Sequence, residues 1–214
     1  MAKRILFQGD SITDCSRNRS DFYGMGTGYP LLVKAALGLD CPNEYDIVNR
    51  GISGNRIVDL YARIKADFIN LKPDYASILI GVNDVWHEIG SQNGVDTEKF
   101  EKIYDMLISE ILTALPDLKL IIMAPYVVKG PATEDCEEVP DRWERFSGEV
   151  KEKAEAAKRL AEKYNLPLID LQAEFDKAEA LAEPTYWAFD GVHPNPAGHE
   201  LIKRAWLETF NKIK

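Results

Sequence analysis

Short apolar runs alternate with longer stretches that have the periodicity of amphipathic helices along the whole chain. The apolar runs are rich in β-branched residues and are nearly continuous, which is typical of parallel strands covered on both faces. They predict five strands, at residues 4–7, 46–49, 75–80, 119–124 and 166–169.

The stretches between these runs repeat apolar residues at three- and four-residue intervals, as a helix packed on a sheet requires. In the second stretch the apolar stripe runs from Ile57 through Leu60 and Ile64 to Phe68. Alternating strands and helices predict an α/β fold, a three-layer α/β/α sandwich with a mainly parallel five-stranded sheet, whose ligands bind at the carboxyl ends of the strands. The predicted helices are residues 29–39, 56–71, 97–115, 142–164 and 196–212.

Length, composition and charge narrow the class of protein. A chain of 214 residues is expected to form one domain, residues 1–214, since two separate cores would each be small. With 45% hydrophobic and 29% charged residues it is neither disordered nor collagen-like. A formal charge of −9 opposes binding to nucleic acid and to anionic membrane surfaces.

Neither a signal peptide nor a membrane span is predicted. The apolar run at residues 5–7 is too short for a signal sequence, and no other stretch approaches the ~18 apolar residues that a span needs. Cys15, Cys41 and Cys136 are far apart and form no CxxC pair, which argues against disulfides and zinc knuckles. We therefore expect a cytoplasmic protein with reduced thiols and no membrane partner.

A serine follows the first predicted strand directly, in Gly9-Asp10-Ser11-Ile12-Thr13. Glycine permits a tight turn there, and a following helical turn would point backbone N–H groups at an anion beside Ser11. This is a position for a nucleophile. The alternative is that Asp10 and Ser11 only cap a helix.

A serine nucleophile needs a base within hydrogen-bond reach, and His193 is the candidate. It lies three residues after Asp190, just before the last predicted helix. Asp190 can accept the Nδ1–H of His193, which leaves Nε2 to take the Ser11 proton. The alternative is that both are turn and N-cap residues.

Acyl transfer also needs donors for a developing oxyanion, and two further loops supply candidates. The Gly51 N–H follows the second predicted strand, and the Asn83 side-chain amide follows the third. Together with the Ser11 N–H they make three donors. Each loop alone is equally compatible with a turn or a helix cap, so the prediction depends on their coincidence.

The ordered set GDSIT, Gly51, Gly81-x-Asn83-Asp84 and Asp190-x-x-His193 resembles the signature blocks of the GDSL, or SGNH, hydrolase family of esterases and lipases. The resemblance implies a flavodoxin-like sheet, with Ser11 as nucleophile, His193 as base oriented by Asp190, and Gly51 and Asn83 in the oxyanion hole. The strings GDSITDC, IGVNDVW and HPNPAGHE are similar to those of intracellular acetyl-xylooligosaccharide esterases.

Secondary features suggest a sugar site and a movable loop. Trp86, Tyr186 and Trp187 flank the proposed catalytic loops, so they are tentative substrate-binding residues, with core packing or a subunit interface as the alternative. Residues 126–141, with three prolines and an acidic cluster, predict a surface loop or lid. We expect self-association from the resemblance and the exposed aromatics.

The remaining polar candidates are expected to play no part in chemistry. Asp14 and Arg17 predict a solvated loop with a salt bridge, with a place in the pocket lining as the alternative. His87 and His199 predict surface or packing positions, with a catalytic part as the alternative. No HExxH motif, cysteine cluster or phosphate-binding loop is present, so neither a metal nor another cofactor is expected.

The sequence therefore predicts a cofactor-free serine esterase that works through an acyl-enzyme. Its best-matching substrate is a small ester, an acetylated xylo-oligosaccharide. A broad-specificity short-chain esterase or a lysophospholipase is the alternative enzyme. A carbohydrate-binding module on the same fold is the alternative without catalysis.

Overall fold

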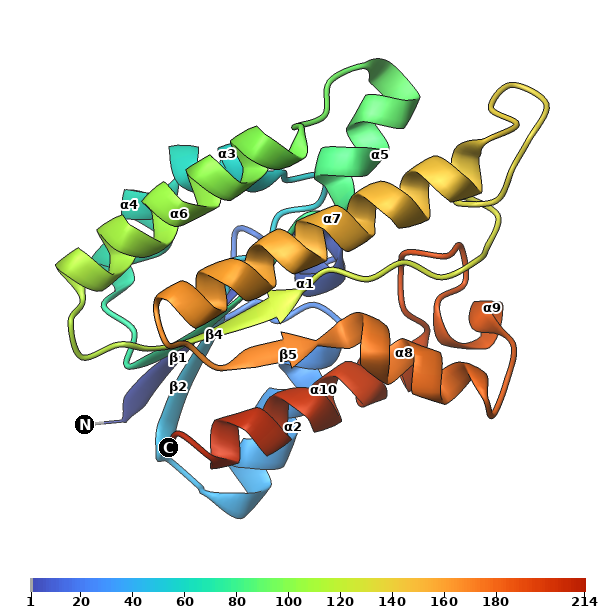
Figure 1. Ribbon diagram of the computed structural model, residues 1–214. Helices are drawn as coiled ribbons and strands as arrows, with labels where there is room; N and C mark the ends of the chain where they lie inside the picture. The colour runs from blue at the N-terminus through green and yellow to red at the C-terminus, as the bar shows by residue number, and fades with distance from the viewer. Residues whose placement is uncertain (1) are drawn as a thin grey trace.

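Five parallel strands form one sheet at the centre of the computed structural model, which describes residues 2–214 (Figure 1). Their order across the sheet is β2-β1-β3-β4-β5, so the chain adds strands on one side of β1 first and then on the other. Doubly wound sheets place their ligands at this switch point, between β1 and β3. The predicted parallel five-stranded sheet is confirmed. The strands are β1 (Lys3–Gly9), β2 (Tyr45–Asn49), β3 (Tyr75–Leu79), β4 (Lys119–Ala124) and β5 (Leu168–Asp170).

Helices cover both faces of this sheet and make the predicted three layers (Figure 1). Successive strand residues point to opposite faces, so Phe7 packs in one buried cluster and Leu6 in the other. One face is covered by α2 (Tyr29–Asp40), α8 (Leu171–Glu179) and α10 (Pro196–Asn211). The other is covered by α3 (Ile57–Ala62), α4 (Ile64–Asp67), α6 (Thr97–Ala114) and most of α7 (Arg142–Lys163). No helix within residues 2–214 is long and apolar enough to cross a membrane.

The predicted helix at residues 56–71 is wrong as one continuous element. Its apolar stripe is buried as expected, but the backbone breaks into α3, α4 and a 3₁₀ turn, η1 (Ile69–Leu71). The first break is at Arg63, whose guanidinium donates to the carbonyls of Gly9 and Arg50. The Arg63 backbone leaves helical geometry there, with φ of −110° and ψ of 12°. The helical turn expected after Ser11 is present as α1 (Ser11–Asp14). Three further helices were not predicted: α5 (Val82–Ser91), α8 and α9 (Pro184–Trp187).

The segment at residues 126–141 is not a surface loop over its first half, so that prediction is wrong there. Tyr126 and Val128 are buried, and so is Thr133, while residues 134–141 are mostly exposed. The buried half packs directly after β4 against the loop that precedes α10, where its N–H groups find backbone carbonyls.

Candidate active site

Ser11 lies at the carboxyl end of β1, where a sharp turn leads into α1. The Asp10 side chain caps this helix by accepting the Ile12 N–H at 3.0 Å, so the capping interpretation holds for Asp10. A side chain at Gly9 would collide with the Leu79 carbonyl, which is why only glycine fits before the turn. Ser11 is left half-buried with its hydroxyl facing another loop.

That hydroxyl belongs to a chain of hydrogen bonds. Ser11 Oγ lies 2.9 Å from His193 Nε2, and His193 Nδ1 lies 2.6 Å from Asp190 Oδ2. The other Asp190 oxygen accepts the backbone N–H groups of Val192 and His193, at 2.9 and 2.7 Å. An ionised carboxylate only accepts, so Nδ1 carries a proton and the neutral ring presents Nε2 as an acceptor. The structure thus joins Ser11, His193 and Asp190 in one chain of hydrogen bonds, although Ser11 and His193 are 182 positions apart in the sequence.

Electrostatics support this protonation pattern. The hydrogen bond to Asp190 raises the pKa of His193 above its ordinary value, against the opposing effect of burial. Burial raises the pKa of Asp190, but the hydrogen bonds from His193 and the neighbouring backbone outweigh it, so the net pKa is lowered. Asp190 therefore stays ionised when His193 gains a proton.

Gly51 cannot supply the predicted free donor. Its N–H already donates to Asn49 Oδ1 at 2.8 Å, and a Cβ at this position would overlap the backbone nitrogen of Asp14. Glycine is needed at residue 51 because the loop packs against α1, and the prediction that its N–H faces an oxyanion is wrong.

Gly54, in the same loop, has the unpaired backbone N–H that was expected of Gly51, within the part of the chain that the structure describes. Its φ is +82°, a Cβ here would meet nothing within 4 Å, and within residues 2–214 its N–H has no hydrogen-bond partner. The sequence could not choose between the two glycines. The other N–H groups of the loop already donate hydrogen bonds. The Arg50 N–H donates to the Phe7 carbonyl and the Ile52 N–H to the Gly9 carbonyl. The Ser53 N–H donates to Asp14 Oδ2 and the Asn55 N–H to the Ile52 carbonyl.

Asn83 lies beside Gly54, in the first turn of α5 rather than in a loop. Its Nδ2 donates to the carbonyl of Asn55, the next residue after Gly54, at 3.1 Å. A side-chain amide has two N–H bonds, so one donor remains. The Ser11 N–H, at the start of α1, also has no partner in the described part of the chain.

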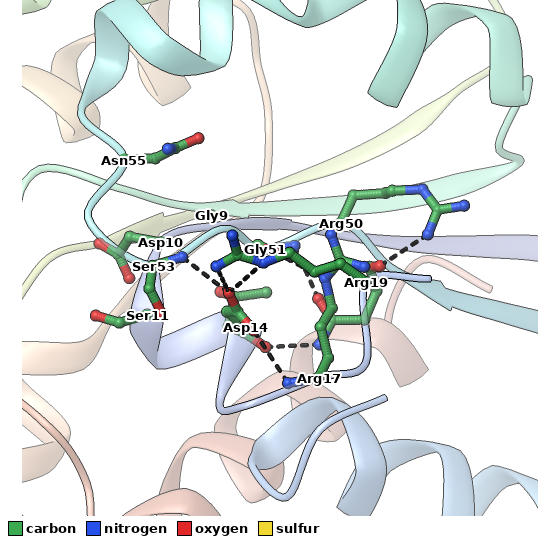
Figure 2. A network of polar contacts seen from close by, with 12 residues as sticks. Gly9, Asp10, Ser11, Asp14, Arg17, Arg19, Arg50, Gly51, Ser53 and Asn55 are labelled. Carbon is green, nitrogen blue, oxygen red and sulfur yellow. Dashed lines mark hydrogen bonds and ion pairs between the residues drawn. The ribbon is translucent and has the colours of Figure 1, made fainter. Parts of the chain in front are cut away.

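A buried polar network supports the loop that contains Gly54, as Figure 2 shows. Asp14 accepts the Ser53 N–H at 2.9 Å and the Arg17 N–H at 3.0 Å, and it pairs with Arg19. Arg17 Nε donates to the Gly51 carbonyl at 2.8 Å. Burial raises the pKa of Asp14, but the bonds from Arg19 and Ser53 outweigh it and lower the pKa overall. Asp14 and Arg17 are buried, so the expectation of a solvated loop is wrong.

Two aromatic rings flank His193. The Trp86 ring centroid lies 5.7 Å away, and Phe189, 55% exposed, stacks on the imidazole at 5.9 Å. Phe189 was not predicted, and no motif marks it apart from its place next to Asp190. Tyr186 is exposed, whereas the Trp187 indole N–H donates to the Ala182 carbonyl. Of the three predicted aromatics, Trp86 is the one whose ring contacts His193.

His199 is a packing residue rather than a surface residue. Its Nδ1 accepts the Tyr29 N–H at 3.2 Å, so Nε2 carries the proton and faces Cys15 Sγ at 3.4 Å. Burial lowers the pKa of His199 to about 4. Within residues 2–214, no three His, Cys, Asp or Glu side chains are grouped so that they could hold a metal ion.

Comparison with known proteins agrees with this geometry. Residues 7–201 match the GDSL-like lipase/acylhydrolase family. The chain belongs to that family. An acetylxylan esterase of Geobacillus stearothermophilus is 35% identical over 212 residues, which cover 96% of this chain and 92% of that protein. The protein is thus a carboxylic ester hydrolase.

Solved structures extend the likeness to the whole fold. A protein described as a GDSL-like lipase from Parabacteroides merdae superposes with a TM-score of 0.89 at 34% identity, over 99% of this chain and 97% of that chain. A catalytic mutant of the Geobacillus esterase, in which an aspartate is replaced by alanine, superposes with a TM-score of 0.83 at 33% identity, over 98% and 95% of the two chains. Catalytic mutants of that esterase at a serine and at a histidine superpose similarly.

Proposed function

We propose that this protein removes acetyl groups from short xylo-oligosaccharides, with Ser11 as nucleophile. The observation that supports this most is the chain of hydrogen bonds from Ser11 through His193 to Asp190, at 2.9 and 2.6 Å, in a family member related to an acetylxylan esterase. A serine hydroxyl, an imidazole and an orienting carboxylate in this order are the parts that serine ester hydrolysis needs.

In the first half-reaction, Ser11 Oγ attacks the ester carbonyl carbon while His193 Nε2 accepts the hydroxyl proton. Asp190 stabilises the imidazolium that forms. The tetrahedral intermediate then breaks its bond to the sugar oxygen, and His193 returns the proton to that oxygen. An acetyl group is left on Ser11 and the sugar leaves with a free hydroxyl.

Three donors are positioned to stabilise the oxyanion. They are the N–H groups of Ser11 and Gly54 and the second N–H of the Asn83 amide, which have no partner among residues 2–214. Gly54 takes the role first assigned to Gly51, because an N–H that already donates to Asn49 cannot also bind an oxyanion.

The second half-reaction repeats the chemistry with water. His193 takes a proton from a water molecule as the water oxygen attacks the acetyl carbonyl carbon. The intermediate then breaks its bond to Ser11 Oγ, His193 returns the proton to that oxygen, and acetic acid leaves and ionises to acetate.

Sugar recognition is assigned to the aromatic rings around His193. Trp86 and the exposed Phe189 provide apolar faces beside the base, and flat apolar rings pack well on the faces of pyranose sugars. A broad-specificity short-chain esterase is the second candidate, favoured by the likeness to a GDSL-like lipase. Self-association and a cytoplasmic location stay predictions from the sequence.

The deciding experiment follows acetate release from acetylated xylo-oligosaccharides by the wild type, Ser11→Ala and Ser20→Ala. Ser20 is an exposed serine that no hydrogen bond links to Ser11, Asp190 or His193 within residues 2–214, and it serves as the control. Ser11→Ala should lose activity by about 10³-fold or more, while Ser20→Ala keeps it. Equal rates in the wild type and Ser11→Ala would overturn the mechanism.

The same proteins separate the alternatives. Hydrolysis of p-nitrophenyl acetate without acetate release from the acetylated xylo-oligosaccharides would favour the broad short-chain esterase. Release of fatty acid from a lysophospholipid would favour a lysophospholipase. Failure of a fluorophosphonate to label Ser11 in the wild type would favour a binding module.

A further inference from the structure

The loop between Asp190 and His193 is bonded through all three of its successive carbonyls to a single other segment, residues 126–132. Most buried backbone polar groups in proteins are hydrogen-bonded, and here the partners of three successive carbonyls all lie in one distant segment of the chain. The Ala132 N–H donates to Asp190 O at 2.9 Å, the Val128 N–H to Gly191 O at 2.9 Å, and the Tyr126 hydroxyl to Val192 O at 2.7 Å.

Close packing adds to these bonds. Gly191 has a φ of +98°, and a Cβ there would lie 2.5 Å from Thr133 Oγ1 and 2.6 Å from Val128 O. The Thr133 hydroxyl accepts the Gly130 N–H at 2.9 Å and donates to Val128 O at 2.8 Å. The segment is therefore folded around the buried Thr133, which also touches the loop.

The segment is anchored to the core at its start. Tyr126 follows β4 after one residue, and its ring stacks on Phe175 of α8 with centroids 3.8 Å apart and planes 7° from parallel. The Val127 N–H donates to Gln172 Oε1, also in α8. Burial raises the pKa of the Tyr126 hydroxyl, so it stays protonated and able to donate.

We propose that residues 126–133 are a brace that positions Asp190 and His193, with Tyr126 and Thr133 as positioning residues for ester hydrolysis. This inference rests on the proposed function, which makes His193 the base. A rigid brace keeps the imidazole 2.9 Å from Ser11 Oγ and 2.6 Å from Asp190, because the carbonyl of Val192 is joined directly to the His193 nitrogen. In this proposal residues 126–133, the first half of the segment 126–141 that the sequence suggested as a surface loop or lid, are a fixed part of the site.

Tyr126→Phe tests the brace with a minimal change, since phenylalanine keeps the ring stacked on Phe175 and removes only the donor to Val192 O. We expect kcat to fall by about tenfold with KM nearly unchanged, because small displacements of a base cost rate rather than binding. The pKa of His193 should fall toward its ordinary value, since the hydrogen bond that His193 donates to Asp190, which raises this pKa, is loosened.

The matched control is Tyr104→Phe. Tyr104 is also a fully buried tyrosine, but its hydroxyl has no hydrogen-bond partner within residues 2–214. It should leave both kcat and the pKa of His193 unchanged. Thr133→Val and Thr133→Ser form a second pair, in which valine should reproduce the effect of Tyr126→Phe and serine, which keeps the hydroxyl, should restore wild-type behaviour.

The readouts are kcat/KM for p-nitrophenyl acetate across pH and an NMR titration of the His193 imidazole. The acidic groups that act on the pKa of His193 are Asp190 and the buried Asp10. His199 interacts electrostatically with His193. None of the variants alters these three residues. An acid limb and an NMR pKa that stay at the wild-type values in Tyr126→Phe and Thr133→Val would overturn the brace.

The two proposals fail in different ways. If the wild type shows no Ser11-dependent hydrolysis, the proposed function is wrong, and the NMR titration still decides whether residues 126–133 position His193. If Tyr126→Phe does not fold, the Thr133 pair decides by the same readouts.

Discussion

The two sides of the Ser11–His193 contact are supported by different kinds of interaction. On the nucleophile side, buried charges make the contacts, as Asp14 binds the Ser53 N–H and Arg17 binds the Gly51 carbonyl. On the base side, neutral donors of residues 126–132 bind the loop carbonyls. Both supports join segments that are distant in the sequence.

Arg63 shows why charge is used on the nucleophile side. Its guanidinium donates to Gly9 O at 3.2 Å, Arg50 O at 2.8 Å and Asn55 Oδ1 at 2.8 Å, so one side chain satisfies acceptors after two different strands. Only a side chain with several diverging donors can do this. The base side has an adjacent chain segment whose own N–H groups suffice. Removing a charged side chain should therefore weaken the support on the nucleophile side, whereas the bonds from residues 126–132 to the loop carbonyls involve no charged group.

The largest effect is expected from Asn83→Ala, which removes an oxyanion donor from the nucleophile side. We expect kcat to fall by about 10²–10³-fold. Steady-state rates with p-nitrophenyl acetate measure this, with Asn93→Ala, an exposed position, as control. A loss below tenfold would contradict the donor role of Asn83.

Next in size is the contrast between the two glycines of the same loop. Gly51→Ala should lower the free energy of unfolding by about 3 kcal/mol, because its Cβ would overlap the Asp14 backbone. Gly54→Ala should cost about 1 kcal/mol, since its Cβ enters open space and only the positive φ is strained. Urea denaturation measures both. Equal losses would mean that the loop does not pack on α1 as described.

The stability cost of removing a charge is expected to be smaller, and it distinguishes the nucleophile side from the base side. Asp14→Asn should lower the free energy of unfolding at pH 7 by about 2 kcal/mol, the contribution of hydrogen bonds to a charged group. Because the folded-state pKa of Asp14 is depressed, this stabilisation is present above the ordinary carboxyl pKa. It should disappear as the pH falls through the lowered pKa.

Thr133→Val is the matched change on the base side. It removes no charge, but it should lower the raised pKa of His193, so its loss of stability should be slightly larger below the ordinary histidine pKa of about 6.5 than at neutral pH, the opposite trend to Asp14→Asn. Urea titrations of both variants from neutral toward pH 3 test this. A cost of Asp14→Asn that does not change with pH would remove the distinction between the two sides.

The smallest expected effect is the position of the acid limb of kcat/KM in the wild type. His193 must be neutral to act as base, and its pKa is raised by Asp190, so activity should fall at pH values still above the ordinary histidine value of about 6.5. Added salt should move this limb only slightly because the pair is partly buried. A limb at or below 6.5 would mean that Asp190 does not perturb His193.

Most of the fold could be predicted because parallel strands are marked by continuous apolar runs. The run at residues 119–124 matches β4, whereas β5 begins two residues later than predicted, after Pro167, which has no N–H to contribute. The helix expected at residues 56–71 breaks at Arg63, whose guanidinium binds carbonyls that are distant in the chain. Such contacts leave no trace in the local periodicity, so the break could not be predicted.

The sequence by itself determined which side chains meet. Ser11, Asn83 and the Asp190–His193 loop each follow a strand or precede a helix in a parallel sheet, and such positions converge at one edge. Only the tertiary structure decided that, among residues 2–214, the N–H of Gly54 is free while that of Gly51 is not, and that residues 126–132 bond to the carbonyls of the Asp190–His193 loop. The physical reason is that a donor is free or bound according to acceptors far away in the chain, which no local pattern of residues records.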